Sequence, residues 1–102
     1  MKKYELKYFE GVKLDVRDAK AWYKQQQEGL EKQFAASIRE SIAALSQAPL
    51  AYAIRYRDVR ICHTKRFPYN IHFMVDDVSN TIAIVAIVHG SRKPGLTSDR
   101  LP

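Results

Sequence analysis

The hydrophobic period of the chain changes at Pro49, and this change constrains the fold more than any other feature. Before Pro49 the apolar residues recur every three or four positions, which is the spacing of one face of an α-helix. After it they alternate with polar residues, which is typical of a β-strand with one buried face. A chain with both patterns buries its apolar surface best by packing helices on a sheet, so we expect an α+β fold. The helical stripe consists of Leu30, Phe34, Ile38, Ile42 and Leu45.

A second helix and a first strand are predicted ahead of this stripe. Lys3–Phe9 is typical of a strand, and Gly11 marks its end. Val12–Gly29 is expected to be helical, with Gly29 as its stop. Only about one residue of loop would then separate the two helices, which favours an antiparallel hairpin. The apolar face of the earlier helix is formed by Val12, Val16, Ala19 and Tyr23.

The strands after Pro49 complete the predicted domain. They lie within Ala53–Phe67, which a turn near Asp58 interrupts, within Pro68–Asp77 and within Thr81–Gly90. The last run is almost wholly apolar, as in a strand that is covered on both faces. We therefore predict an N-terminal strand, an antiparallel helical hairpin and a mostly antiparallel sheet of three or four strands. Residues 1–102 are expected to form one domain.

Charge and composition narrow the possible partners and cofactors. The net charge is +6, which favours an anionic partner such as nucleic acid, a ribosome or an acidic protein segment. No apolar run approaches the roughly 20 residues of a membrane span, and a lone Cys62 excludes an intrachain disulfide, which suits a cytoplasmic protein. The sequence has no metal-ligand spacing and no Gly-rich phosphate loop, so we expect no metal and no cofactor.

The stretch before the strand within Pro68–Asp77 combines cations with aromatic residues. We expect Phe67 and Tyr69 to cover the end of the core, while Lys65 and Arg66 remain exposed and available to a partner. The three histidines have structural interpretations. His63 and His72 are expected to face solvent, and His89 is expected to lie at a strand end, where its ring packs on the helices and bonds a loop.

The segments AWYKQQQEGLEKQF, RFPYNIHF and AIVAIVHGSRKP, together with Ala48–Pro49, carry a resemblance. In this order they resemble the RelE/ParE superfamily of toxins from bacterial type II toxin–antitoxin systems, which are also called plasmid stabilisation proteins. The resemblance runs from about Lys3 to Pro94. It implies a compact, microbial-RNase-like fold and a cytoplasmic toxin that a cognate antitoxin neutralises.

The resemblance leaves the target open, because one fold hosts different activities. Ribonuclease relatives place an arginine directly after the aromatic residue that opens the strand, and here that position is the neutral Asn70. Arg92 matches a second nuclease arginine, but no aromatic residue follows Pro94. The absence of two of these three nuclease residues favours ParE-like inhibition of an essential target, DNA gyrase. One alternative is a RelE-like, ribosome-dependent mRNA endoribonuclease, whose cations and acid–base groups would be His89, Arg92, Lys65 and Arg66. A non-toxic binding relative is the other alternative.

An antitoxin partner follows from the resemblance. It is expected to be an acidic, partly disordered segment that folds on the hairpin and on the basic face of the sheet, forming a hetero-oligomer. The residues expected to contact the target or the antitoxin are Lys65, Arg66, Tyr69, Arg92, Lys93 and Trp22.

Overall fold

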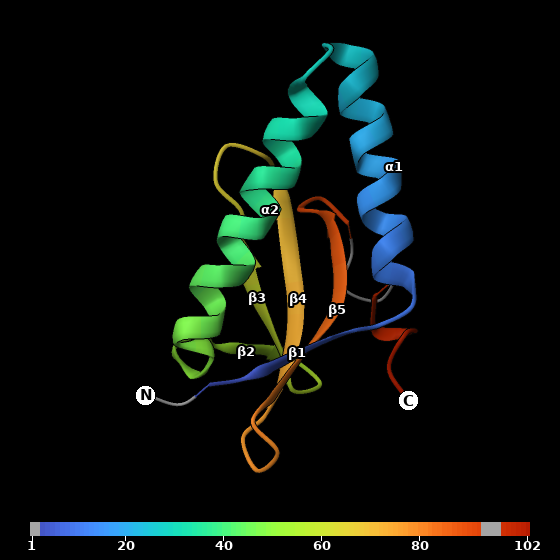
Figure 1. Ribbon diagram of the computed structural model, residues 1–102. Helices are drawn as coiled ribbons and strands as arrows, with labels where there is room; N and C mark the ends of the chain where they lie inside the picture. Colours follow the sequence, from blue (N-terminus) through green and yellow to red (C-terminus); the bar gives the residue numbers. More distant parts are fainter. Residues whose placement is uncertain (1–2, 93–96) are drawn as a thin grey trace.

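The computed structural model describes residues 3–92 and 97–102. Two helices pack on a five-stranded sheet (Figure 1), so the expected α+β architecture is confirmed. Within these residues, neither helix has an apolar stretch long enough to cross a membrane. The elements are β1 (Glu5–Tyr8), α1 (Gly11–Gln26), α2 (Leu30–Gln47), a short 3₁₀ helix η1 (Pro49–Ala51), β2 (Ile54–Tyr56), β3 (Val59–His63), β4 (Tyr69–Asp76) and β5 (Thr81–His89).

Helices α1 and α2 form the expected antiparallel hairpin (Figure 1). The turn is longer than predicted, because the three residues Gln27–Gly29 separate the helices. Gly29 has a φ of 95° and is the N-cap of α2, so it begins the second helix and does not end the first. Only glycine adopts this backbone conformation without strain. The Gly29 N–H donates to Oε1 of Glu31 at 2.8 Å, which satisfies a donor at the helix start.

The sheet has the strand order β1-β5-β4-β3-β2. Strands β2 to β5 are antiparallel neighbours, whereas β1 pairs in parallel with β5, with Glu5 opposite Thr81 and Tyr8 opposite Ile84. The predicted turn lies between β2 and β3, where Arg57 and Asp58 have positive φ angles of 40° and 66°. The first strand to be synthesised therefore pairs with the last one.

The main core lies between the hairpin and the sheet. Phe34 and Leu45 of α2 are fully buried there, in one cluster with residues of α1, β3, β4 and β5. Phe67 and Tyr69 close one end of this core, as predicted, because their rings contact that of Phe34 at centroid distances of 5.4 and 5.0 Å. Tyr23 is buried in the same aromatic group, while its neighbour on α1, Trp22, is 55% exposed.

The opposite face of the sheet is covered by the C-terminal segment, residues 97–102. Leu101 packs against Val85, Ala86 and Val88. His72, which was expected to face solvent, is buried there with an exposed fraction of 3%. The alternation placed His72 on the correct face of the sheet. The prediction that His72 faces solvent is wrong, because the C-terminal segment covers that face.

A hydrogen-bond chain joins this segment to the sheet. The hydroxyl of Tyr56 on β2 lies 2.8 Å from Nδ1 of His72 and 2.7 Å from Oγ1 of Thr97. Arg57 donates to the carbonyl oxygens of Ser98 and Pro102. The C-terminal segment is thus held by polar contacts as well as by Leu101.

A bidentate ion pair joins the same segment to α1. The two terminal nitrogens of Arg100 each lie 2.7 Å from a carboxylate oxygen of Asp15. Arg100 also donates to the Val85 carbonyl at 3.0 Å. The guanidinium of Arg100 lies close to the backbone of Gly11. A Cβ at Gly11 would lie 2.8 Å from the guanidinium carbon, so the position requires a residue without a side chain. One side chain thereby links the chain end, α1 and β5.

Candidate functional site

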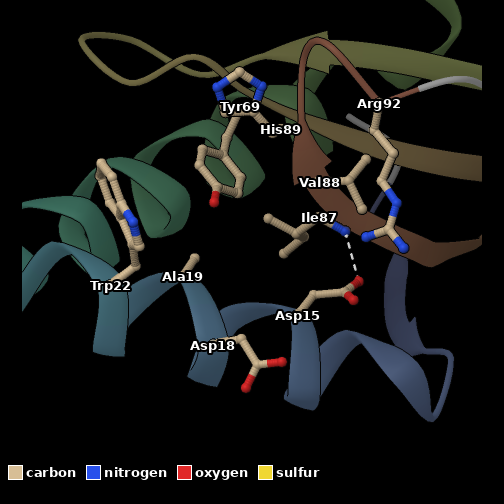
Figure 2. Close-up of a pocket in the computed structure, with 9 residues that line it drawn as sticks. All are labelled: Asp15, Asp18, Ala19, Trp22, Tyr69, Ile87, Val88, His89 and Arg92. Carbon is tan, nitrogen blue, oxygen red and sulfur yellow. Dashed lines mark hydrogen bonds between the residues drawn. The ribbon is translucent and has the colours of Figure 1, made fainter.

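A hollow of about 300 Å³ lies between α1 and the end of β5. Figure 2 shows its two walls, which are side chains of α1 on one side and of the sheet and the turn after β5 on the other. Four residues predicted from the sequence to bind a partner or to act in catalysis meet here. The lining residues are Asp15, Asp18, Ala19, Trp22, Tyr69, Ile87, Val88, His89 and Arg92.

The α1 wall contains two carboxylates and an exposed indole. Asp15 accepts a hydrogen bond from the backbone N–H of Ile87 at 3.0 Å (Figure 2), in addition to its pair with Arg100. Asp15 therefore bonds a backbone N–H of β5 that lies beyond the end of β1, and Arg100 balances its negative charge. Asp18 is exposed, and its only ion-pair contact among the described residues is a long one of 3.5 Å to Arg17. Trp22 offers an apolar surface beside these acids.

On the sheet side, Tyr69 and His89 lie edge to face, with ring centroids 5.6 Å apart. Nδ1 of His89 accepts a hydrogen bond from the backbone N–H of Ser91 at 3.1 Å and lies 2.8 Å from its hydroxyl. This contact assigns the ring proton of the neutral form to Nε2. Burial, and secondarily the charge of Asp15, raise the pKa of Tyr69, which therefore stays a neutral phenol. His89 thus lies at the strand end and bonds a loop as predicted, but its ring packs on Tyr69 of β4 and not on the helices.

Arg92 is exposed in the turn after β5, where its backbone N–H donates to the His89 carbonyl at 3.0 Å. Among residues 3–92 and 97–102, its guanidinium has no ion-pair partner. Lys93, predicted to act beside it, lies outside the described residues. Arg92 is consequently the cation that this hollow offers to a ligand or partner.

Lys65 and Arg66 lie elsewhere. Lys65 lines a separate hollow of about 140 Å³ between α2 and β3, with Glu40 and Cys62 among its other residues. Burial raises the pKa of the Cys62 thiol, as expected for a small buried side chain. Arg66 is exposed in a turn with a φ of 70°. These two cations and Arg92 therefore do not surround one common hollow.

Two histidines meet at a third hollow, of about 410 Å³, at the end of the sheet. His63 and His89 both line it, and Nδ1 of His63 lies 2.6 Å from Oδ1 of Asn70. The lining of this hollow includes no lysine and no arginine. Stabilising the charge of a reacting phosphate needs cations aimed at it, and this hollow supplies none. His89 meets a cation only in the first hollow, where Arg92 stands without Lys65 or Arg66. No group of three potential metal ligands occurs in the described part of the chain.

Sequence reasoning missed Asp15 and Asp18 as parts of the site. A signal was present, because Asp15, Asp18 and Trp22 follow one another at steps of three and four residues and therefore share one flank of α1. What the sequence could not supply was the neighbour of that flank. The site also depends on Ile87, whose N–H bonds Asp15 beyond the end of β1.

Comparison with known proteins shows the family of the chain and agrees with its fold. The model of the family described as "ParE toxin of type II toxin-antitoxin system, parDE" matches residues 6–94. The fold is similar to that of a chain of the chromosomal ParDE toxin–antitoxin system from P. aeruginosa, with a TM-score of 0.74, 20% identity, and coverage of 87% of this chain and 98% of that one. It is also similar to a chain of the toxin–antitoxin complex RelBE2 from Mycobacterium tuberculosis, with a TM-score of 0.61, 18% identity, and coverage of 87% and 93%. No curated protein matches the sequence significantly.

Proposed function

The chain belongs to the ParE toxin family of type II toxin–antitoxin systems, and we propose that it inhibits DNA gyrase and is neutralised by a cognate antitoxin. Residues 6–94, which match the family, include both helices and all the strands except the first residue of β1. The target is an inference from the site, because the fold itself hosts more than one activity.

The composition of the first hollow is the observation that carries this proposal. Trp22, Tyr69 and Arg92 line it together, and these residue types dominate the energetics of protein–protein interfaces. The exposed carboxylate of Asp18, which has only a long contact with Arg17, lines the same hollow and would repel a phosphate group. Such a mixed surface favours binding to a protein over catalysis on an RNA backbone.

The ribonuclease alternative lacks the corresponding support. Its residues are divided, with Arg92 and His89 in one hollow, Lys65 in another, and Arg66 exposed in a turn. Asn70 bonds His63 and is neutral, so it does not replace the missing arginine. We therefore place inhibition of gyrase ahead of cleavage of messenger RNA.

The antitoxin is proposed to be an acidic, partly disordered segment that covers the cations at this end of the molecule. Lys65, Arg66 and Arg92 are all exposed there, and Trp22, Tyr69 and Lys93 complete the proposed contact surface. A disordered acidic chain can reach separate hollows, because it folds along the surface as it binds. The complexes named for the two structural neighbours are consistent with such a partner.

The proposal is tested with purified gyrase, ATP and relaxed plasmid DNA. We expect the wild-type protein to inhibit supercoiling and to increase cleaved DNA, and R92E to be at least about tenfold weaker, as for an interface hot spot. R39E is the matched control, because Arg39 is exposed on α2 and lines none of the three hollows of the site. The R92E change should also weaken the complex with the antitoxin and reduce its salt dependence.

Expression in a bacterial host separates the three functions. Filamentous cells with blocked replication agree with the proposal. Rapid loss of translation with fragments of messenger RNA would show a ribonuclease and would reject gyrase as the target. Normal growth at high soluble expression would leave a non-toxic binding relative.

A further inference from the structure

One flank of α1 carries a strip of four cations that the functional site does not use. Lys13, Arg17, Lys20 and Lys24 follow one another at steps of four, three and four residues, so they share one side of the helix. All four are exposed. At a rise of 1.5 Å per residue, the strip is about 16 Å long. Asp15, Asp18 and Trp22 lie on the other flank, which faces the first hollow.

The charges of this strip are not balanced within the protein. Lys13, Lys20 and Lys24 form no ion pair with any residue that the structure describes, and Arg17 has only the exposed contact with Asp18. Like charges at these spacings destabilise a helix. Lys13 also lies in the first turn, which contains no acidic residue, and a cation there opposes the helix dipole. A bound anion would relieve this repulsion, since a cluster of one sign of charge attracts the opposite sign.

The shape of the strip indicates which kind of anion. Lys13, Arg17 and Lys20 line a hollow of about 300 Å³ whose only other lining residue is Val16. Lys13 and Arg17 also line a neighbouring hollow with Glu10 and Leu14, an apolar side chain that is 48% exposed. One leucine beside the strip does not make the apolar centre of a protein interface, in which lysine is depleted. The strip also contains no aromatic side chain, on which the bases of a single strand would stack.

We propose that this strip of α1 binds the phosphate backbone of duplex DNA. Phosphates are spaced by about 3.4 Å along the axis for each strand, so the strip spans about five of them. The contact would be independent of sequence, because cations that neutralise phosphates do not read bases. The choice of DNA over duplex RNA rests on the proposed function, since gyrase acts on DNA.

The test measures binding of a fluorescent DNA duplex of about 20 base pairs at roughly 50 to 200 mM salt, without gyrase or antitoxin. The variants are R17Q/K24Q and the control K32Q/R39Q. Each pair combines one lysine with one arginine seven residues apart, and each lowers the net charge by two. We expect R17Q/K24Q to bind roughly tenfold or more weakly and the slope of log affinity against log salt to fall by about 1.8, as for two lost phosphate contacts. K32Q/R39Q should bind like the wild type.

Three results would overturn the inference. Equal losses in both variants would mean that only net charge matters. Binding of a polyglutamate peptide in preference to the duplex would assign the strip to an acidic protein segment. Binding of an RNA duplex alone would reject DNA. Because gyrase is absent, these results are distinct from failure of the supercoiling assay, and circular dichroism spectra of both variants verify that they are folded.

Discussion

The imidazole of His72 is buried under the C-terminal segment, and its surroundings resist protonation. Burial, and then the positive charge of Arg100, lower its pKa from 6.5 to about 4. Between these values the unfolded chain binds a proton that the folded protein does not. The folded state should therefore lose stability as the pH falls from 6.5 to 4, by up to about 3 kcal/mol. Urea unfolding at a series of pH values measures this loss.

The control is H72N, whose amide can still bond the Tyr56 hydroxyl but does not titrate. We expect the dependence on pH between 4 and 6.5 to be shallower in H72N than in the wild type. Parallel curves for the two proteins would show that other groups cause the acid sensitivity.

The environment of His72 also shows where inference from the sequence ends. Alternation along Pro68–Asp77 correctly placed Ile71 and Phe73 in the main core. It could not show that the other face is covered, because residues 97–102 carry no period that marks them as a covering element. Thr97 and Leu101 contact that face only because the folded chain returns to it, and no local sequence pattern marks this contact.

Helix α1 has a buried side, an acidic and aromatic flank, and a cationic flank. On the cationic flank, Lys20 lies three residues after Arg17 and four before Lys24. K20E converts both repulsions into attractions, so we expect it to stabilise the protein by about 1 kcal/mol. Thermal and urea unfolding measure the gain. R39E is the control and should change the stability by less than about 0.5 kcal/mol, because the residues three and four positions from Arg39 carry no charge. If K20E brought no gain in stability, the charges of the strip would not repel one another.

The elements were more predictable than their pairing. The periodic spacing indicated both helices and the strands after Pro49, because helices and strands bury faces with different periods. The length of the turn at Gln27–Gly29 was underestimated, because glycine is common both at helix ends and in left-handed turns. The parallel pairing of β1 with β5 had no local signal, and the same holds for the hollow between β5 and α1.

The C-terminal segment is held to α1 by the pair of Asp15 with Arg100. The side chains are 7% and 26% exposed, so removing one partner leaves a largely desolvated charge. We expect D15N to destabilise the whole protein by about 2–4 kcal/mol, as measured by urea unfolding. In a cycle with R100Q, the coupling energy should be at least about 1 kcal/mol. Additive effects of the two changes would mean that the pair contributes no stability of its own.

The pairing of β1 with β5 has a consequence for how the protein is made. Synthesis delivers the N-terminal residues first, yet the partner of β1 begins only at Thr81, after both helices and the other three strands have been translated. Arg100, which pairs with Asp15 of α1, is translated later still. Ribosome-bound chains that stop before Thr81 should therefore remain open to proteases over β1. Translation that is interrupted before Thr81 therefore leaves β1 without its partner strand and yields no finished sheet.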